Sequence, residues 1–388
     1  MSDIVDNTAA CCICGGIAVD ELPEYRGLRR VTSDCRPWPS GGRIGSCRDC
    51  GAVQKPAAAT FLAEIDDIYQ TYAIYHQGAG AEQAVFEQAS GLPASRSARL
   101  LDTFRRSFDL KPVGRMLDVG CGNGATIRAF GQIAPGWVKK GTEFDAKYRS
   151  EVESIPNTEL LHVGPLATVP GPFDVITMIH VLEHMVSPVD ALRELRPKLA
   201  DGGLLLIEVP HHLANPFELL IADHRSHFTA DSLARALFTT GYEVVTLVDD
   251  WIPKELSVVA RPAICNSSAP PPCDPTAARK RVATGIRWLV DTGAQLRTIA
   301  TQGPVGLFGT SIAGTWLAVE VDDAVGFFVD EDPARAGRSY RGRPVYAPAD
   351  IPSGSRVFVG LPPAVAEEIC CRLARPDVSF LSPGRATT

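Results

Sequence analysis

The residues of this 388-residue chain that are best suited to chemistry include eleven cysteines, six of which lie within the first fifty positions. Four of the six form two C-x-x-C pairs: Cys11 with Cys14, and Cys47 with Cys50. A C-x-x-C turn directs two thiolates at one point, and two such turns complete a sulfur tetrahedron around Zn²⁺. Because four thiolates leave no open coordination position, we predict a structural zinc site. Cys12 and Cys35 are candidate substitutes, and a run of free thiols is the alternative interpretation.

Histidines form the second concentration of reactive side chains, with six of the eight lying between His180 and His227. His184 follows an apolar strand pattern, and His224 directly follows Asp223. A carboxylate beside an imidazole can hold one tautomer and raise the basicity of the ring. We therefore expect His224, oriented by Asp223, to remove a proton, while His184 stabilises an oxyanion or shares the proton transfer. An ordinary solvated or capping histidine is the alternative for each ring.

A glycine-rich turn predicts a cofactor site. Residues 116–119 form an apolar strand pattern, and the chain then turns through Gly120, Gly122 and Gly124 into a helical pattern. Glycines let the backbone approach a ligand closely, and the start of the helix presents unpaired N–H groups. Glu143 ends the next predicted strand, about 20 residues on, where an acid can accept hydrogen bonds from ribose hydroxyls.

Further strand patterns at 173–178, 199–208 and, as the last strand, 242–248 alternate with helical segments. This alternation predicts an α/β fold with a doubly wound parallel sheet, whose ligands lie beyond the carboxyl ends of the strands. The order of these landmarks resembles that of class I S-adenosylmethionine-dependent methyltransferases. The resemblance implies S-adenosylmethionine as cofactor, bound by the following residues: Asp118, Gly120, Gly122, Gly124, Glu143 and His180.

The C-terminal part of the chain repeats the strand–turn–helix pattern at 304–315. Its turn reads Gly309-x-Ser311-x-x-Gly314, with serine where dinucleotide-binding turns carry their middle glycine. A second strand with an acidic end follows at 325–330. We predict a second, smaller Rossmann-like domain. Both a degraded site with a structural role and a live site for a nucleotide-bearing substrate fit this pattern.

The length of the chain allows two or three domains. We predict the following division: a zinc-binding module at 1–56, a helical connector at 57–112, a methyltransferase domain at 113–260, a linker at 261–279 and a Rossmann-like domain at 280–388.

The formal net charge of −7 argues against a nucleic-acid partner, which favours a basic face. No apolar run is long enough to cross a bilayer, and the polar, acidic first residues do not resemble a secretory signal. We therefore expect a cytoplasmic protein that acts on a small molecule and binds no membrane.

The combination of two C-x-x-C pairs, the methyltransferase pattern and a C-terminal Rossmann-like pattern resembles the sugar-nucleotide C-methyltransferases. Those enzymes methylate a carbon beside a ketone on a nucleotide-linked deoxyhexose, on the way to branched sugars of antibiotics or polysaccharides. The resemblance implies a nucleotide-sugar substrate, and a tyrosine of the N-terminal helical region at the sugar site. By position this tyrosine is Tyr72 or Tyr75, with His76 beside them. Packing along one helical face is the alternative role for these tyrosines.

The chain departs from that family at Ile221, where a tyrosine usually stands three residues before the paired histidine. That tyrosine is one of the family's candidate bases. Two other functions therefore stay open: O- or N-methylation of a sugar or another small biosynthetic intermediate, and a cofactor-binding module without catalysis that serves a protein partner.

Overall fold

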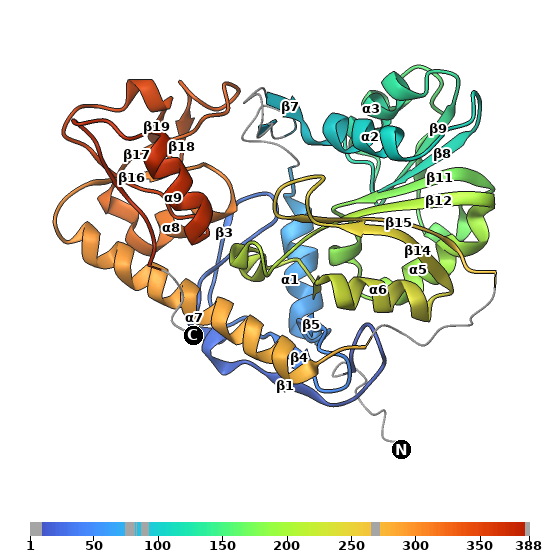
Figure 1. The fold of residues 1–388 in the computed structure, drawn as a ribbon, viewed down its shortest axis with the longest axis horizontal. Helices are drawn as coiled ribbons and strands as arrows, with labels where there is room; N and C mark the ends of the chain where they lie inside the picture. The colour runs from blue at the N-terminus through green and yellow to red at the C-terminus, as the bar shows by residue number, and fades with distance from the viewer. Residues whose placement is uncertain (1–9, 74–81, 83, 87–92, 265–271, 385–388) are drawn as a thin grey trace.

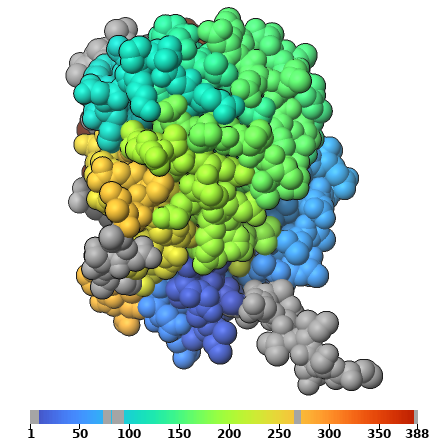
Figure 2. Space-filling view, turned by 90° about the vertical axis from the view of Figure 1, so that its right-hand side faces the viewer, coloured from blue at the N-terminus to red at the C-terminus, as the bar shows by residue number. Residues whose placement is uncertain are grey.

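The computed structural model describes residues 10–73, 82, 84–86, 93–264 and 272–384. Two open sheets lie on opposite sides of the molecule, the larger one in green and the smaller one in red and orange (Figure 1). The blue N-terminal segment lies below and between them, and the space-filling view shows it directly beneath the green part of the chain (Figure 2). Residues 10–70 are thus placed to contact both sheets.

The larger sheet has seven strands in the order β10-β9-β8-β11-β12-β15-β14. Their bounds are β8 Arg115–Val119, β9 Val138–Glu143, β10 His162–Val163, β11 Phe173–Ile179, β12 Leu199–Pro210, β14 Tyr242–Val248 and β15 Glu255–Pro262. Six strands run parallel, and β15 alone runs antiparallel between β12 and β14. The predicted doubly wound sheet is confirmed. The prediction that 242–248 is the last strand was wrong, because β15 follows it and inserts beside β12.

Helices cover both faces of this sheet, because apolar residues point from each face. On one face pack α2 (Arg96–Ser107) and α3 (Ala125–Ile133), whose Phe104 and Phe130 contact the same buried cluster. On the other pack α5 (Pro188–Leu195) and α6 (Ala230–Thr239). A short helix, α4 (Arg149–Glu153), follows β9. This three-layer arrangement leaves the carboxyl ends of the parallel strands free to form a site.

The smaller sheet has the order β18-β19-β17-β16-β20-β21, with β18 as its antiparallel edge. Its elements are β16 Val305–Phe308, α8 Ile312–Val321, β17 Val325–Val329, β18 Ser339–Tyr340, β19 Arg343–Tyr346, β20 Arg356–Phe358, α9 Pro363–Arg372 and β21 Ser379–Leu381. A Cβ on Gly314 would lie 2.0 Å from the Gly309 carbonyl oxygen, so α8 packs this close to the turn only because residue 314 is glycine. The Rossmann-like prediction is confirmed.

The N-terminal segment forms a four-stranded sheet whose last strand, β13, comes from the segment between β12 and α6. Its strands are β1 Val19–Glu21, β4 Gly45–Cys47, β5 Val53–Gln54 and β13 Ser226–His227. Two small pairs, β2 (Arg30–Val31) with β3 (Pro37–Trp38) and β6 (Ala84–Phe86) with β7 (Pro93–Ser95), lie outside the three sheets. The helix α1 (Ala59–Gln70) then runs up toward the larger sheet (Figure 1). The β5–β13 pair places the histidine-rich segment against the cysteine-rich one.

A long helix, α7 (Pro275–Ala300), begins within the segment predicted as a linker and packs against both β4 and α8. One buried cluster accordingly joins N-terminal residues such as Tyr25 and Val31 to Leu289 of α7 and Trp316 of α8. Of the helices that the structure describes, none combines the length and the apolar character needed to cross a bilayer.

Candidate active site

The glycine turn after β8 has backbone conformations that only glycine adopts without strain. Gly120, Gly122 and Gly124 have φ values of 65°, 52° and 81°. A Cβ on Gly120 would lie 2.6 Å from Val181 Cγ2. The turn therefore brings bare backbone to the end of β8, as the sequence pattern predicted for a cofactor cradle.

Two carboxylates border this turn. Asp118, in β8, is 2% exposed, and its Oδ1 accepts a 2.6 Å hydrogen bond from Thr177 Oγ1. Its Oδ2 is buried and makes no hydrogen bond to a described residue, and burial raises the pKa of Asp118 to about 7. Glu143, at the end of β9, accepts a 2.6 Å hydrogen bond from the Gly122 N–H. S-adenosylmethionine carries an ammonium group, a ribose and an amino-acid backbone. The free oxygen of Asp118, the carboxylate of Glu143 and the exposed backbone of the glycine turn fit these three groups.

His180, at the end of β11, is held by carboxylates. Its φ of 54° is unusual for a non-glycine residue. Its ring nitrogens lie 3.3 Å from Glu183, 3.4 Å from Glu208 and 3.6 Å from Glu255. Burial opposes protonation of the ring, but the three acids outweigh it and raise the pKa of His180 to about 10. The ring lies beside the predicted cofactor crevice, where its role in binding stays a prediction.

Asp223 lies against His184 and not, as predicted, against its chain neighbour His224. Asp223 Oδ2 is 3.4 Å from His184 Nδ1, and Ser33 fixes the same carboxylate through its N–H (2.8 Å) and hydroxyl (2.5 Å). Burial opposes the charged form of His184, whereas Asp223 raises its pKa above the ordinary value. The expected orientation of His224 by Asp223 was wrong, because the short turn after η7 (Pro216–Leu220) points the two side chains to different partners.

His224 lies between the rings of His184 and His227, and these three side chains together with Asp223 are called the histidine group below. The Nδ1 of His224 is 3.5 Å from Glu218 Oε2, and its ring meets that of His184 edge-on, with centroids 4.5 Å apart. Burial, aided by the charge on His184, holds the pKa of His224 well below its ordinary value, so the ring is neutral near pH 7. The structure thus brings His184, Asp223 and His224 together, as expected, but in a different order of contacts.

This group is positioned by two residues that the sequence did not indicate. Lys55 is buried; its Nζ donates to the carbonyl oxygens of Ile221 and His224 (2.9 Å to His224) and lies 3.2 Å from His227 Nε2. Tyr69, in α1, places its hydroxyl 3.1 Å from His184 Nδ1. The available signal for Lys55 was a lone charged residue shortly after the Cys47–Cys50 pair, two positions beyond the apolar Ala52 and Val53.

The tyrosine that the structure brings to the histidines is Tyr69, three residues before Tyr72, and the sugar-site role expected of Tyr72 or Tyr75 stays a prediction. Tyr69 contacts His184, whereas Tyr72 packs on the Tyr69 ring with centroids 5.2 Å apart. The Tyr72 carbonyl accepts a 2.5 Å hydrogen bond from Lys147. Tyr75 and His76 lie outside the described residues.

The four predicted zinc ligands form one group. Cys11 Sγ is 3.6 Å from Cys50 Sγ, and Cys14 Sγ is 3.6 Å from Cys47 Sγ; all four sulfurs lie within 4.8 Å of one another. The edge of a tetrahedron with Zn–S bonds of about 2.3 Å is close to this separation. The donor set fits Zn²⁺ and has no open position for a substrate.

The two spare cysteines serve other contacts. Cys12 Sγ lies 3.3 Å from Ser226 Oγ, in the strand that follows the histidine turn. Cys35 lies apart from the cluster, with a φ of 63°, and its carbonyl accepts a 3.3 Å hydrogen bond from Tyr340. The structure therefore favours the four ligands that the paired spacing predicted.

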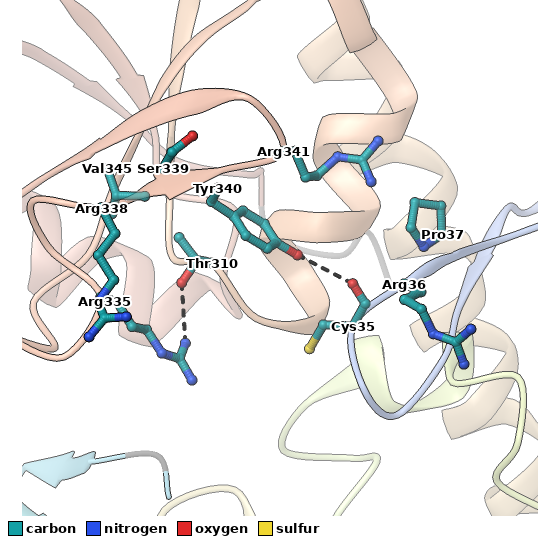
Figure 3. A pocket seen from close by; sticks show the side chains of 10 residues that line it. All are labelled: Cys35, Arg36, Pro37, Thr310, Arg335, Arg338, Ser339, Tyr340, Arg341 and Val345. Carbon is teal, nitrogen blue, oxygen red and sulfur yellow. Dashed lines mark hydrogen bonds between the residues drawn. The ribbon is translucent and has the colours of Figure 1, made fainter. Parts of the chain in front are cut away.

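A cavity of about 380 Å³ lies between the N-terminal loop that carries Cys35 and Arg36 and the C-terminal sheet (Figure 3). Four arginines line it: Arg36, Arg335, Arg338 and Arg341. Arg36 is paired with Asp34 at 2.9 Å, and Arg335 lies 3.6 Å from Asp330. Arg338 and Arg341 make no side-chain hydrogen bond or ion pair with a described residue. The cavity thus offers exposed positive charge suited to an anion.

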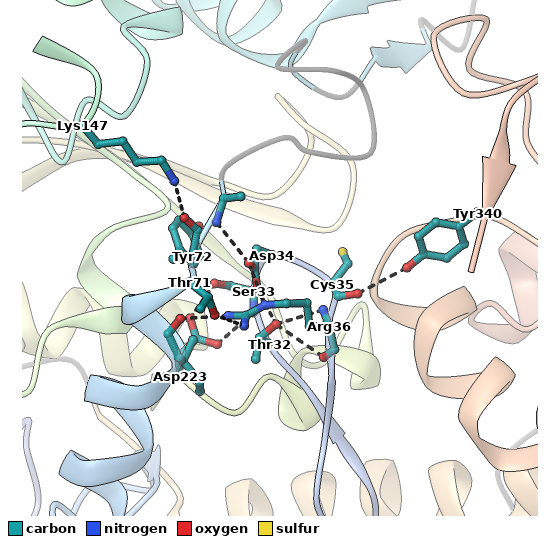
Figure 4. A network of polar contacts seen from close by, with 12 residues as sticks. Thr32, Ser33, Asp34, Cys35, Arg36, Thr71, Tyr72, Lys147, Asp223 and Tyr340 are labelled. Atoms are coloured by element: carbon teal, nitrogen blue, oxygen red, sulfur yellow. Dashed lines mark hydrogen bonds and ion pairs between the residues drawn. The ribbon is translucent and has the colours of Figure 1, made fainter. Parts of the chain in front are cut away.

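One short loop joins the two sites (Figure 4). Ser33 contacts Asp223 at the histidine group, and Cys35, two residues on, lines the arginine cavity. Between them Asp34 accepts a 3.1 Å hydrogen bond from the Ala73 N–H and pairs with Arg36. The loop is therefore fixed at both ends.

A family model for the methyltransferase domain matches residues 88–247. The tRNA U34 carboxymethyltransferase of Vibrio cholerae is 28% identical over 152 residues, which are 35% of this chain and 47% of that protein. The ubiquinone biosynthesis O-methyltransferase of Caulobacter sp. is 29% identical over 101 residues, 24% of this chain and 39% of the relative. The chain thus spans less than half the length of these relatives.

The chain contains a class I methyltransferase domain. Among solved structures, that of the mitomycin 7-O-methyltransferase MmcR is 16% identical, with a TM-score of 0.39, over 52% of this chain and 67% of that one. The family model and the strand order of the larger sheet confirm the predicted S-adenosylmethionine-dependent methyltransferase domain. The four-cysteine segment and the Rossmann-like sheet lie outside the match.

Proposed function

We propose that this chain transfers a methyl group from S-adenosylmethionine to a carbon beside the ketone of a nucleotide-linked deoxysugar. The supporting observation is the loop at 32–36, which contacts Asp223 at one end and lines an arginine cavity at the other. A nucleotide sugar carries a diphosphate between its base and its sugar. Guanidinium groups bind such phosphates through charge-assisted hydrogen bonds. The diphosphate would bind Arg338 and Arg341, and the sugar would reach toward the histidine group.

The chain's own residues would divide the work of the reaction. Asp118, Glu143 and the glycine turn would hold S-adenosylmethionine, which supplies the methyl group when bound. Asp223 keeps His184 oriented, and the His184–Asp223–His224 group would handle the proton of the acceptor and stabilise the negative charge that develops on its oxygen. The acceptor carbon then forms a C–C bond as the sulfur–methyl bond breaks, which releases S-adenosylhomocysteine.

Methylation of oxygen or nitrogen is the second candidate, and Ile221 favours it. This side chain is buried, and its backbone carbonyl accepts a hydrogen bond from Lys55. The position therefore offers no hydroxyl to serve as the base for removing a proton from carbon. A sugar hydroxyl or amine is more acidic, or more nucleophilic, than a C–H group and needs less help from a base.

The four-cysteine group would bind one structural Zn²⁺. Its function would be to hold the β5–β13 pair, and with it the segment that carries Asp223 and His224. The non-catalytic alternative, a cofactor-binding module for a protein partner, does not account for the buried histidine group.

Turnover with labelled S-adenosylmethionine tests the proposal. The full-length, zinc-loaded chain is incubated with nucleoside-diphosphate-linked keto-deoxyhexoses, and NMR of the product locates the new methyl on carbon, oxygen or nitrogen. We expect Arg338→Ala with Arg341→Ala to raise the KM for the nucleotide sugar at least tenfold and to leave the Kd for S-adenosylmethionine unchanged. Arg106→Ala, an exposed arginine of α2, is the matched control. Binding of the cofactor without turnover on any such sugar would reject the proposal.

A further inference from the structure

Two imidazoles and one carboxylate converge within the histidine group: Glu183, His184 and His224. One ligand atom from each lies within 4.8 Å of the other two. The side chain of Glu183 is 1% exposed, that of His184 16% and that of His224 4%. The backbone fixes the set as well, because the Arg225 N–H donates to the Glu183 carbonyl at 2.7 Å. The three side chains are therefore preorganised around one point.

Each imidazole has a carboxylate behind it. His184 Nδ1 lies 3.4 Å from Asp223 Oδ2, and His224 Nδ1 lies 3.5 Å from Glu218 Oε2. Histidines that bind metals nearly always place their second ring nitrogen against a carboxylate or carbonyl, which fixes the ring and makes the other nitrogen a better donor. Both Nδ1 atoms have such a carboxylate partner, which leaves the second nitrogen of each ring without one.

Glu183 supplies an independent indication of a missing partner. Neither of its carboxylate oxygens makes a hydrogen bond to a described residue, and only Oε1 has an ion-pair contact, 3.3 Å from His180 Nδ1. Leaving a buried carboxylate oxygen unsatisfied is costly, so such a group calls for a ligand. A cation at the point shared with the two imidazoles would satisfy it.

We propose that Glu183, His184 and His224 bind a divalent transition-metal ion at a second site, separate from the four cysteines. Two imidazoles and one carboxylate on one side of an ion are a known donor set for such metals, and they leave positions open for water and substrate. Lys55 and His227 also face His224. The carboxylates of Glu183 and Asp223 supply the negative charge beside the ion, and the carboxyl of Glu218 lies behind His224.

This site deepens the proposed function and rests on it for its role. The ion would bind an oxygen of the acceptor and stabilise negative charge there. With both imidazoles bound to the ion, a hydroxide at another open position would take the acceptor proton in their place and become water. The acceptor then bonds to the methyl carbon as the sulfur–methyl bond breaks, so charge and atoms balance without a tyrosine at position 221. Binding of the ion itself is independent of the acceptor.

Metal stoichiometry tests the site without any turnover. The full-length chain is titrated with Co²⁺, and bound metal is counted by mass spectrometry after gel filtration. We expect Glu183→Gln and His224→Ala each to lose one equivalent relative to wild type. The equivalent they lose should give visible d–d bands without thiolate-to-cobalt charge transfer, because its donors are nitrogen and oxygen. His162→Ala, outside the group, should keep the wild-type count.

Folding is checked by binding of S-adenosylhomocysteine, which Glu183→Gln should retain. Equal metal counts in wild type and in a folded Glu183→Gln variant would overturn the site. If Glu183→Gln loses one equivalent of metal but wild type methylates no nucleotide sugar, the metal site stands and the substrate class is rejected. If wild type methylates a nucleotide sugar but binds no more metal than Glu183→Gln does, the proposed function stands and the metal site is rejected.

Discussion

Replacing Asp118 by asparagine tests whether this buried acid faces the cofactor. Asp118 Oδ1 is held by Thr177, whereas Oδ2 makes no hydrogen bond to a described residue. Burial raises the pKa of Asp118 to about 7, so part of the free protein carries a proton there near neutral pH. The ammonium and sulfonium charges of S-adenosylmethionine favour the carboxylate. We therefore expect binding of the cofactor to release this proton.

The size of the release follows from the pKa. It should be largest below pH 7, should fall as the pH rises above 7, and should be smaller for Asp118→Asn at every pH. Calorimetric titration in buffers of different ionisation enthalpy measures it. At pH 8 the variant should bind S-adenosylmethionine about 10- to 100-fold more weakly, since a hydrogen bond to a charged group contributes about 1.5–3 kcal/mol. No proton release from wild type at pH 6, or equal release from both proteins, would refute the assignment.

The same carboxyl makes stability depend on pH. Its pKa is about 7 in the folded protein and about 3.8 in the unfolded chain. Between these values the unfolded state has already lost the proton, so stability falls as pH rises from about 4 to about 7. The loss is about 4 kcal/mol, because each of about three pKa units contributes about 1.4 kcal/mol. Asp118→Asn should lack this dependence in denaturant unfolding, while Asp102→Asn, an exposed control in α2, should keep it.

Three further outcomes are expected. Gly120→Ala should weaken S-adenosylmethionine binding at least tenfold by calorimetry, because the added Cβ would meet Val181 and φ is 65°; unchanged affinity would contradict the cradle. Cys47→Ser should lower both the zinc content and the melting temperature, and a variant that keeps its zinc would exclude this ligand. Lys55→Met should reduce kcat at least tenfold and leave the Kd for S-adenosylhomocysteine unchanged, because it removes donors to the histidine turn; the exposed Lys280→Met is the control, and equal kcat for the two would dismiss a positioning role.

The fold was predictable where local patterns carry it. The glycine turn, the acidic end of β9 and the strand–turn–helix of the C-terminal sheet depend on neighbouring residues in the chain, and each stands where the sequence indicated. The strand β15 was missed. Its apolar run is short, and its place between β12 and β14 follows from pairing with residues about 50 positions earlier.

The site was predictable in its members but not in its contacts. Clustering along the chain identified His184, Asp223 and His224. Their partners were beyond reach of the sequence, because Asp223 meets Ser33 from 190 residues away and His184 meets Tyr69 from 115 residues away. Adjacency in the chain suggested the pair Asp223–His224, but successive residues in a turn direct their side chains differently. The division into domains at 56, 112, 260 and 279 stays a prediction.

The histidine group depends on the N-terminal segment as much as on the methyltransferase domain. Ser33, Lys55 and Tyr69 reach it from the first seventy residues, and the β5–β13 pair joins the two parts of the chain by backbone hydrogen bonds. A methyltransferase domain cut out at residue 93 would keep the glycine turn and Glu143 but lose these three contacts. Such a fragment should still bind S-adenosylhomocysteine and fail to methylate. Turnover by the fragment at the rate of the full chain would show that the N-terminal contacts do not serve catalysis.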